Sequence, residues 1–326
     1  EPEEGFKEQE VISQKDMGEN VDEEAKEHGT NKNSEEKKKD DGITGNFQKK
    51  SSKGAGMTIQ KDEKAGKHTI GTFADLKKYL EGKNNHDLTV SLPEGQEAIT
   101  VTSTITIKNQ MTLNLNGYKI RQSKNLTGAM FLIESGASLA ISGGGTITGN
   151  DQNVVLSQPM IVNRGTLSIS SISLQSVANN GSQGDLTQDS INGATSLLYN
   201  RGTATLSGCS VAGCSSDYGF TIYNSAGTMN LVGCSIGGTA NHGGIGNGSV
   251  MHVNGCNIFG NTVSNKADDG SACRIGGLAN SAGATMYIYG STSIYQNASY
   301  IQMGGGIYNG GTIYIGPVSY THLTLP

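Results

Sequence analysis

Charged residues are scarce over most of this chain. Residues 68–326 contain 11 Lys or Arg and 12 Asp or Glu, together 23 of 259 positions. The sequence also has no Trp and only five Pro, which argues against a Trp-lined or proline-rich binding module. No stretch approaches the roughly 18 apolar residues that a membrane-spanning helix needs. We therefore expect no membrane span, and no signal peptide is visible.

Charge is concentrated at the N-terminus. Residues 1–67 hold 13 Lys and 17 Asp or Glu, together 30 of 67 positions, and their only aromatic residues are Phe6 and Phe47. Such a segment cannot bury enough apolar surface to offset its ordering entropy. We predict a disordered charged tail over 1–67, a folded body over 68–316 and a separate terminal segment over 317–326.

The basic residues exclude one class of partner. The tail mixes both signs, and only four Lys or Arg follow residue 125. A nucleic-acid surface needs clustered basic side chains, so we expect no nucleic-acid partner.

The body opens with a helix and continues as strands. Thr72-Phe73-Ala74-Asp75 fits a capping box with Asp in place of Glu. The apolar residues that follow fall on one helical face, and Gly82 ends the pattern. The sequence therefore predicts a capping helix of about three turns over 72–82. From Leu88 onwards apolar residues alternate with Thr, Ser or Asn, and this period of two predicts short half-buried strands.

Internal repetition indicates the fold. The repeated unit is an apolar residue, a variable residue, Asn and a Gly-containing turn, followed by an alternating strand. The Asn copies are Asn163, Asn200, Asn224, Asn247, Asn280 and Asn309, and an earlier copy is interpreted with Glu134 at the Asn position. Asn and Gly tolerate the backbone of sharp turns, and stacked Asn side chains can hydrogen-bond to one another. We predict that these residues form a structural turn ladder.

The spacing of the copies defines the architecture. The two tightest intervals are 24 and 23 residues, from Asn200 to Asn224 to Asn247. A bare period of about 23 residues fits three short strands and three turns, which is one coil of a parallel β-helix. We therefore predict an all-β, single-stranded, right-handed parallel β-helix solenoid with nine or ten coils, an N-terminal capping helix and a disordered tail.

Three of the five cysteines follow the same repeat. Cys209, Cys234 and Cys256 fall at equivalent places in three consecutive coils, so we predict a structural ladder of free, buried thiols. Zinc sites need paired ligands at short spacings with a second pair. The sequence offers no such set, and we expect no metal or other cofactor.

The repeats resemble a known class of bacterial proteins. The Gly-Gly-x-φ-x-Asn units, such as Gly304-Gly305-Gly306-Ile307-Tyr308-Asn309, are similar to right-handed β-helix repeats of surface proteins, including chlamydial polymorphic outer-membrane proteins. The segment 72–120 resembles the capped start of pectin-lyase-like domains. The resemblance implies the fold and a bacterial, extracellular or cell-surface location, while all the matching residues are structural.

The residues that could support catalysis are few. Asp268-Asp269, Arg274 and His242 are reminiscent of polygalacturonase-like hydrolases, but their order along the chain differs from that family. Arg164 and Arg201 occupy equivalent turns, with no carboxylate expected close in the repeat register. His252 is interpreted as a surface turn residue. The sequence therefore leaves enzymatic activity open, favours a non-catalytic protein and assigns no catalytic residue.

Coils longer than 23 residues carry their insertions at one repeat position, which places them on one edge of the rod. Such an edge is often a binding face. We expect a monomeric, non-catalytic, adhesin-like protein that binds or presents to glycans or to host or bacterial surface proteins. The alternatives are a carbohydrate-active lyase or glycoside hydrolase, and a structural stalk.

Both ends of the chain give a further expectation. The first residue is Glu1 rather than Met, which suggests a processed form or a fragment. Residues 317–326 interrupt the repeat in mid-coil and resemble translated sequencing-adapter read-through. We assign no role to His322 within this segment.

Overall fold

The computed structural model describes residues 65–126, 128–149, 159–175, 178–179, 197–216, 220–238, 243–263, 275–299 and 304–316. The chain divides into two compact units, 1–59 and 60–326, and all described residues belong to the second. The predicted disordered tail falls almost entirely outside the described residues, as does the terminal segment after residue 316.

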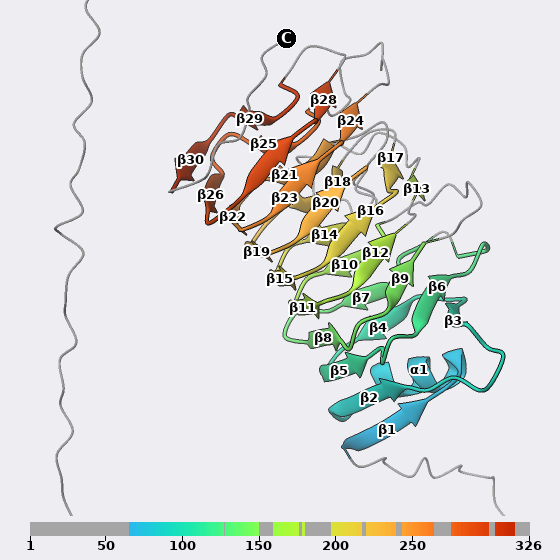
Figure 1. The fold of residues 1–326 in the computed structure, drawn as a ribbon. Helices are drawn as coiled ribbons and strands as arrows, with labels where there is room; N and C mark the ends of the chain where they lie inside the picture. Colours follow the sequence, from blue (N-terminus) through green and yellow to red (C-terminus); the bar gives the residue numbers. More distant parts are fainter. Residues whose placement is uncertain are drawn as a thin grey trace, which may run out of the picture. The chain divides into compact units, whose positions relative to one another are not determined.

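Three long sheets, in which every strand pair is parallel, make up the body (Figure 1). Sheet A has the order β1 (Gly66–Ile70), β2 (His86–Val90), β5 (Gln110–Asn114), β8 (Ser138–Ser142), β11 (Thr166–Ser170), β15 (Thr203–Ser207), β19 (Thr228–Val232), β22 (Val250–Asn254), β26 (Thr285–Tyr289), β30 (Thr312–Ile315). Sheet B runs β3 (Ala98–Val101), β6 (Lys119–Gln122), β9 (Thr146–Thr148), β12 (Ser173–Gln175), β16 (Ser210–Ala212), β20 (Ser235–Gly237), β23 (Asn257–Phe259), β27 (Ser293–Tyr295). Sheet C runs β4 (Ile105–Ile107), β7 (Phe131–Ile133), β10 (Ile161–Asn163), β14 (Leu198–Asn200), β18 (Phe220–Asn224), β21 (Gly243–Asn247), β25 (Leu278–Asn280), β29 (Ile307–Asn309).

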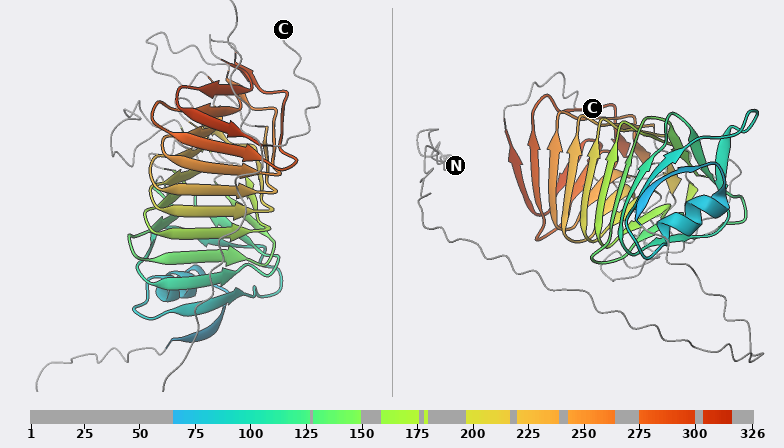
Figure 2. Two further views of the ribbon diagram at one scale, coloured as in Figure 1. Left: turned by 90° about the vertical axis from the view of Figure 1, so that its left-hand side faces the viewer. Right: turned by 90° about the horizontal axis from the view of Figure 1, so that it is seen from below.

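The chain visits the sheets in a fixed cycle of B, C and A, and then begins the next coil one strand further along each sheet. Figure 2 shows the strands of one sheet stacked in sequence order. Two short pairs, β13 (Ala178–Asn179) with β17 (Ser215–Ser216) and β24 (Thr262–Val263) with β28 (Ala298–Ser299), extend some coils. The architecture is a parallel β-helix, and the predicted fold class is confirmed.

Alternation along each strand builds the core. In β19 Met229 and Leu231 are fully buried, and the register places Met251 and Val253 of β22 directly over them. The intervening residues face outwards because successive side chains point to opposite faces of a strand. Burying each such side chain contributes about 1.5–3 kcal/mol. One coil cannot enclose this face alone, so stacking closes the core.

The N-terminal end of the coils is covered by helix α1 (Phe73–Leu80), which packs on β2, β3 and β4 (Figure 2, right). The Thr72 side chain accepts a hydrogen bond from the Asp75 backbone N–H at 3.1 Å, which is the capping interaction that the sequence predicts. Leu76 and Leu80 are fully buried. The helix has eight residues, about two turns, and is shorter than the predicted range 72–82.

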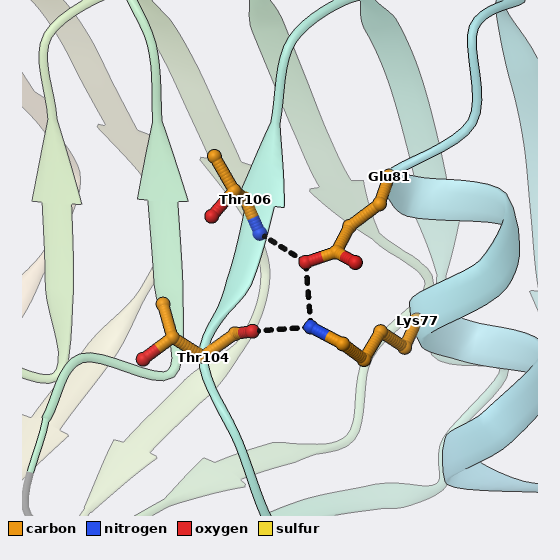
Figure 3. A network of polar contacts seen from close by, with 4 residues as sticks. All are labelled: Lys77, Glu81, Thr104 and Thr106. Atoms are coloured by element: carbon orange, nitrogen blue, oxygen red, sulfur yellow. Dashed lines mark hydrogen bonds and ion pairs between the residues drawn. The ribbon is translucent and has the colours of Figure 1, made fainter.

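Two charged side chains of this cap satisfy the open edge of sheet C (Figure 3). Lys77 Nζ donates to Glu81 Oε1 and to the Thr104 carbonyl oxygen, both at 2.6 Å. Glu81 Oε1 also accepts from the Thr106 backbone N–H at 2.9 Å. The ion pair thus supplies β4 with one donor and one acceptor, which are the groups that a preceding strand would supply.

Aromatic rings cover the outer side of sheet C where its strands are rich in glycine. Phe220 and Tyr223 of β18 stack with ring centroids 5.6 Å apart. A Cβ atom added at Gly246 would lie 2.6 Å from the Phe220 ring and 2.7 Å from the Tyr223 ring. Glycine at this position therefore admits the two rings, and Tyr223 and its neighbour Tyr199 are buried here as packing residues.

Candidate binding surface

The outward face of sheet A is organised in columns that run from coil to coil. The central column consists of residues that share one register position, namely Asp87, Thr112, Ala140, Ser168, Thr205, Asn230, His252, Tyr287 and Tyr314. Small or polar side chains fill its N-terminal part, where Thr112 Oγ1 donates to Asp87 Oδ1 at 2.7 Å. Further along, Asn230 Nδ2 donates to Thr205 Oγ1 at 3.3 Å.

The C-terminal part of this column is aromatic. His252 stacks on Tyr287 with centroids 4.7 Å apart and 7° between the planes, and Tyr287 stacks on Tyr314 at 5.0 Å and 11°. Tyr289 lies beside them, with its ring 6.3 Å from His252 and nearly perpendicular to it. We call His252, Tyr287, Tyr289 and Tyr314 the aromatic strip. Tyr314 is 56 % exposed and Tyr289 36 %.

The stacking determines which parts of the rings face solvent. Tyr287 is stacked between the rings of His252 and Tyr314, so both of its ring faces are covered. Tyr314 is the last ring of this column among the described residues, and 56 % of it is exposed. Each tyrosine thus combines an apolar body with a hydroxyl that both donates and accepts hydrogen bonds.

The described surroundings of the strip are polar but uncharged. Beyond Arg201 the described part of the chain contains no Asp, Glu, Lys or Arg. The flanking columns of sheet A carry Asn254 beside the strip on one side and Thr285 and Thr312 on the other. A surface of this composition can recognise a ligand through hydrogen bonds and apolar contact, and offers no charge to a charged ligand.

The predicted turn ladder lies inside the rod, on sheet C. Each amide Nδ2 donates to the Oδ1 of the Asn in the next coil. The distances are 2.7 Å for Asn163–Asn200 and Asn200–Asn224, and 2.9 Å for Asn224–Asn247, Asn247–Asn280 and Asn280–Asn309. All members except Asn309 are fully buried, so the ladder is structural and contributes nothing to a solvent-facing site.

The prediction that Glu134 holds the Asn position in the earliest copy of the repeat is wrong by one residue. Asn163 pairs with Ile133, not with Glu134. The position points inwards, so the apolar Ile133 can fill it as Asn does, whereas the charged Glu134 must turn outwards. There Glu134 Oε2 lies 3.8 Å from Arg164. The expectation that no carboxylate lies close to this arginine in the repeat register is therefore wrong.

The structure places Cys209, Cys234 and Cys256 at matching positions immediately before β16, β20 and β23, all buried and reduced. The hydrogen bond with Cys234, followed by burial, raises the pKa of Cys209, while the Cys234 bond lowers the pKa of Cys256. For Cys234, the bond with Cys209 lowers the pKa, but the bond with Cys256 and burial outweigh it and raise the pKa to about 11.

The residues considered for catalysis are not brought together in the described structure. Asp268, Asp269, Arg274 and His242 fall outside the described residues. His252 lies in the middle of strand β22, so its assignment to a turn is wrong. Within the described ranges no three His, Cys, Asp or Glu side chains are placed to hold a metal ion, and no helix there is long and apolar enough to cross a membrane.

The insertions fall at one position in the chain order of the strands. Residues 150–158, 180–196, 264–274 and 300–303 each follow a sheet B strand or its short extension and precede a sheet C strand. These segments lie outside the described residues. No protein-family model, curated protein or solved structure matches this chain.

Proposed function

We propose that this protein is a non-catalytic, adhesin-like β-helix of the bacterial cell surface that binds uncharged glycans. The aromatic strip on the outward face of sheet A carries the proposal. It places three tyrosines and a histidine on consecutive coils, in a part of the structure whose described residues include no charged side chain. The pectin-lyase-like character and the bacterial origin belong to the proposal and are supported by the sequence resemblance.

The chemistry of the strip suits a sugar chain. A pyranose ring has apolar C–H faces and a rim of hydroxyls. The exposed ring surfaces of Tyr289 and Tyr314 can pack against a C–H face, and the tyrosine hydroxyls and the His252 ring nitrogens can exchange hydrogen bonds with the rim. Consecutive coils lie about 4.8 Å apart, which is close to the length of one sugar unit in an extended chain, so a glycan can run along the rod.

The lack of charge favours neutral ligands. Recognition of an acidic polysaccharide requires complementary charge at the surface. The strip contains no Lys or Arg side chain that could supply positive charge for this purpose. We therefore expect neutral gluco-, manno-, xylo- and galacto-oligosaccharides to bind better than oligogalacturonate.

The test uses a panel of these oligosaccharides and isothermal titration calorimetry. Because tyrosines at the centre of an interface are among the most costly residues to truncate, Tyr287→Ala and Tyr314→Ala should each weaken binding about tenfold or more. Ser168→Ala is the matched control, since it lies in the same column but away from the strip. Its affinity should equal that of the unchanged protein.

The same incubations distinguish the alternatives. Unsaturated or reducing-end products that disappear in Asp269→Ala would establish a polysaccharide-degrading enzyme and contradict the proposal. Absence of binding across neutral and acidic glycans would favour a stalk. Binding that survives both tyrosine substitutions would place the ligand elsewhere, for example on the corner that carries the insertions.

A further inference from the structure

Three thiols occupy one position in consecutive coils. The backbone N–H of Ser235 donates to the Cys209 carbonyl oxygen at 2.9 Å, and that of Asn257 donates to the Cys234 carbonyl oxygen at 2.8 Å. These bonds keep the three cysteines aligned along the rod. We call Cys209, Cys234 and Cys256 the thiol ladder.

The coil spacing determines which thiols can be joined. Neighbouring coils lie about 4.8 Å apart, and disulfides join Cα atoms about 4.4–6.8 Å apart. Cys234 therefore lies within disulfide range of Cys209 on one side and of Cys256 on the other. Cys209 and Cys256 are separated by two coils, about 10 Å, which is beyond that range.

The neighbours of the ladder isolate it from other thiols along the column. Ile172 holds the equivalent position in the preceding coil, and Thr292 holds it in the following one, where the Cys256 backbone N–H donates to Thr292 Oγ1 at 3.3 Å. Neither residue can join a disulfide. The column therefore contains three sulfurs and two neighbouring pairs, both of which include Cys234.

We propose that the thiol ladder is a redox modification site in which Cys234 forms a disulfide with either Cys209 or Cys256, and never with both. The bond joins two successive coils at the start of sheet B. Its formation removes one proton from each thiol and joins the two sulfurs. The two electrons and two protons pass to an external oxidant, such as the N=N bond of a diazene, which becomes a hydrazine.

Burial sets the conditions of the reaction. The three thiols are at most 2 % exposed, and the thiolate is the reacting form of cysteine. An oxidant can therefore reach these thiols only when the coils open locally. Two neighbouring cysteines of the ladder must also move slightly closer together, because disulfides prefer Cβ atoms about 3.8 Å apart. We expect slow oxidation that stops after one disulfide and leaves one thiol reduced.

The experiment uses the full chain with Cys214→Ala and Cys273→Ala, so that only the ladder remains. The folded protein is oxidised with diamide, its free thiols are alkylated in urea, and the linked peptides are identified by mass spectrometry. Two of the three thiols should disappear, and every linked pair should contain Cys234. Cys209→Ala and Cys256→Ala should each still lose two thiols.

Cys234→Thr supplies the decisive comparison, because Thr292 shows that threonine fits this position. This variant should keep both remaining thiols when folded. Protein oxidised in urea, where any pairing is possible, serves as the control and should yield the Cys209–Cys256 link. If Cys234→Thr loses its β-sheet circular dichroism, the variant is unfolded and is set aside. The linked peptides of the protein with all three ladder thiols then test the proposal.

Two results would overturn the proposal. One is a Cys209–Cys256 link in the folded protein. The other is that all three thiols stay reduced, or pair between molecules, at a diamide concentration that fully oxidises the protein in urea.

Discussion

Replacing Asn224 by alanine breaks the turn ladder at its middle. The Asn224 amide is fully buried and accepts from Asn200 Nδ2 at 2.7 Å. It donates to Asn247 Oδ1 and to the Val250 carbonyl oxygen, both at 2.9 Å. All three hydrogen bonds disappear in Asn224→Ala, and the ladder is divided into two shorter pieces.

The magnitude follows from these contacts. Each hydrogen bond contributes about 1 kcal/mol net, so the loss amounts to about 3 kcal/mol. The amide partners on both sides keep a second contact, since Asn200 Nδ2 still donates to the Gly202 carbonyl oxygen and Asn247 Oδ1 still accepts from Ser249 N–H. We therefore expect no large additional cost from buried groups without partners.

Urea unfolding followed by far-UV circular dichroism measures this loss. Native-state hydrogen exchange complements it, because repeat proteins can open locally around a weakened coil. Asn230→Ala is the matched control, since this outward asparagine has one long hydrogen bond of 3.3 Å to Thr205 and lies outside the ladder. A cost below about 1 kcal/mol for Asn224→Ala, or one no greater than that of Asn230→Ala, would refute this reasoning.

Three further predictions follow from other parts of the structure. Gly246→Ala should destabilise the protein by about 1–3 kcal/mol, because the added Cβ would overlap the rings of Phe220 and Tyr223. Gly306→Ala is the control and should be nearly neutral, because no atom lies within 4 Å of its added Cβ. Equal urea midpoints for the two variants would contradict this prediction. Glu81→Ala should lower the free energy of unfolding by about 1–2 kcal/mol, because the contacts of Glu81 with Thr106 and Lys77 are lost. Glu94→Ala, at an exposed position, should change it little. Thermal unfolding of the two variants compares these effects. The pKa of Cys234 is raised to about 11, which keeps this thiol protonated at pH 8. Iodoacetamide should therefore modify Cys234 slowly until urea unfolds the protein. Rapid modification of the folded protein would contradict the burial of this thiol.

The sequence predicts the repeat well because turns and inward positions are chemically restricted. Asn marks the end of the same strand in six coils and Gly the turn that follows, and alternation marks the strands between them. The register fails at Glu134, where the inward position holds Ile133 instead of Asn. An isoleucine fills the inward position as an asparagine does. In the sequence, however, nothing distinguishes Ile133 from the apolar residues beside it.

The aromatic strip is harder to predict. His252, Tyr287 and Tyr314 lie at the centre of three strands that share the pattern apolar-aromatic-apolar. Outward positions tolerate almost any side chain, so their chemistry shows no period. The spacings differ because insertions separate the coils. Only the strand register reveals that the three rings stack on one another.

Fluorine NMR of the protein labelled with fluorotyrosine tests the central claim most directly. Resonances are assigned by single Tyr→Phe substitutions, and the protein is titrated with the neutral oligosaccharide that binds best in the calorimetric panel. The proposed function predicts that the signals of Tyr287, Tyr289 and Tyr314 shift with saturation, while those of the partly buried Tyr118 and the buried Tyr199 stay unchanged. Saturable shifts confined to other tyrosines, or calorimetric binding with no change in the strip, would contradict it.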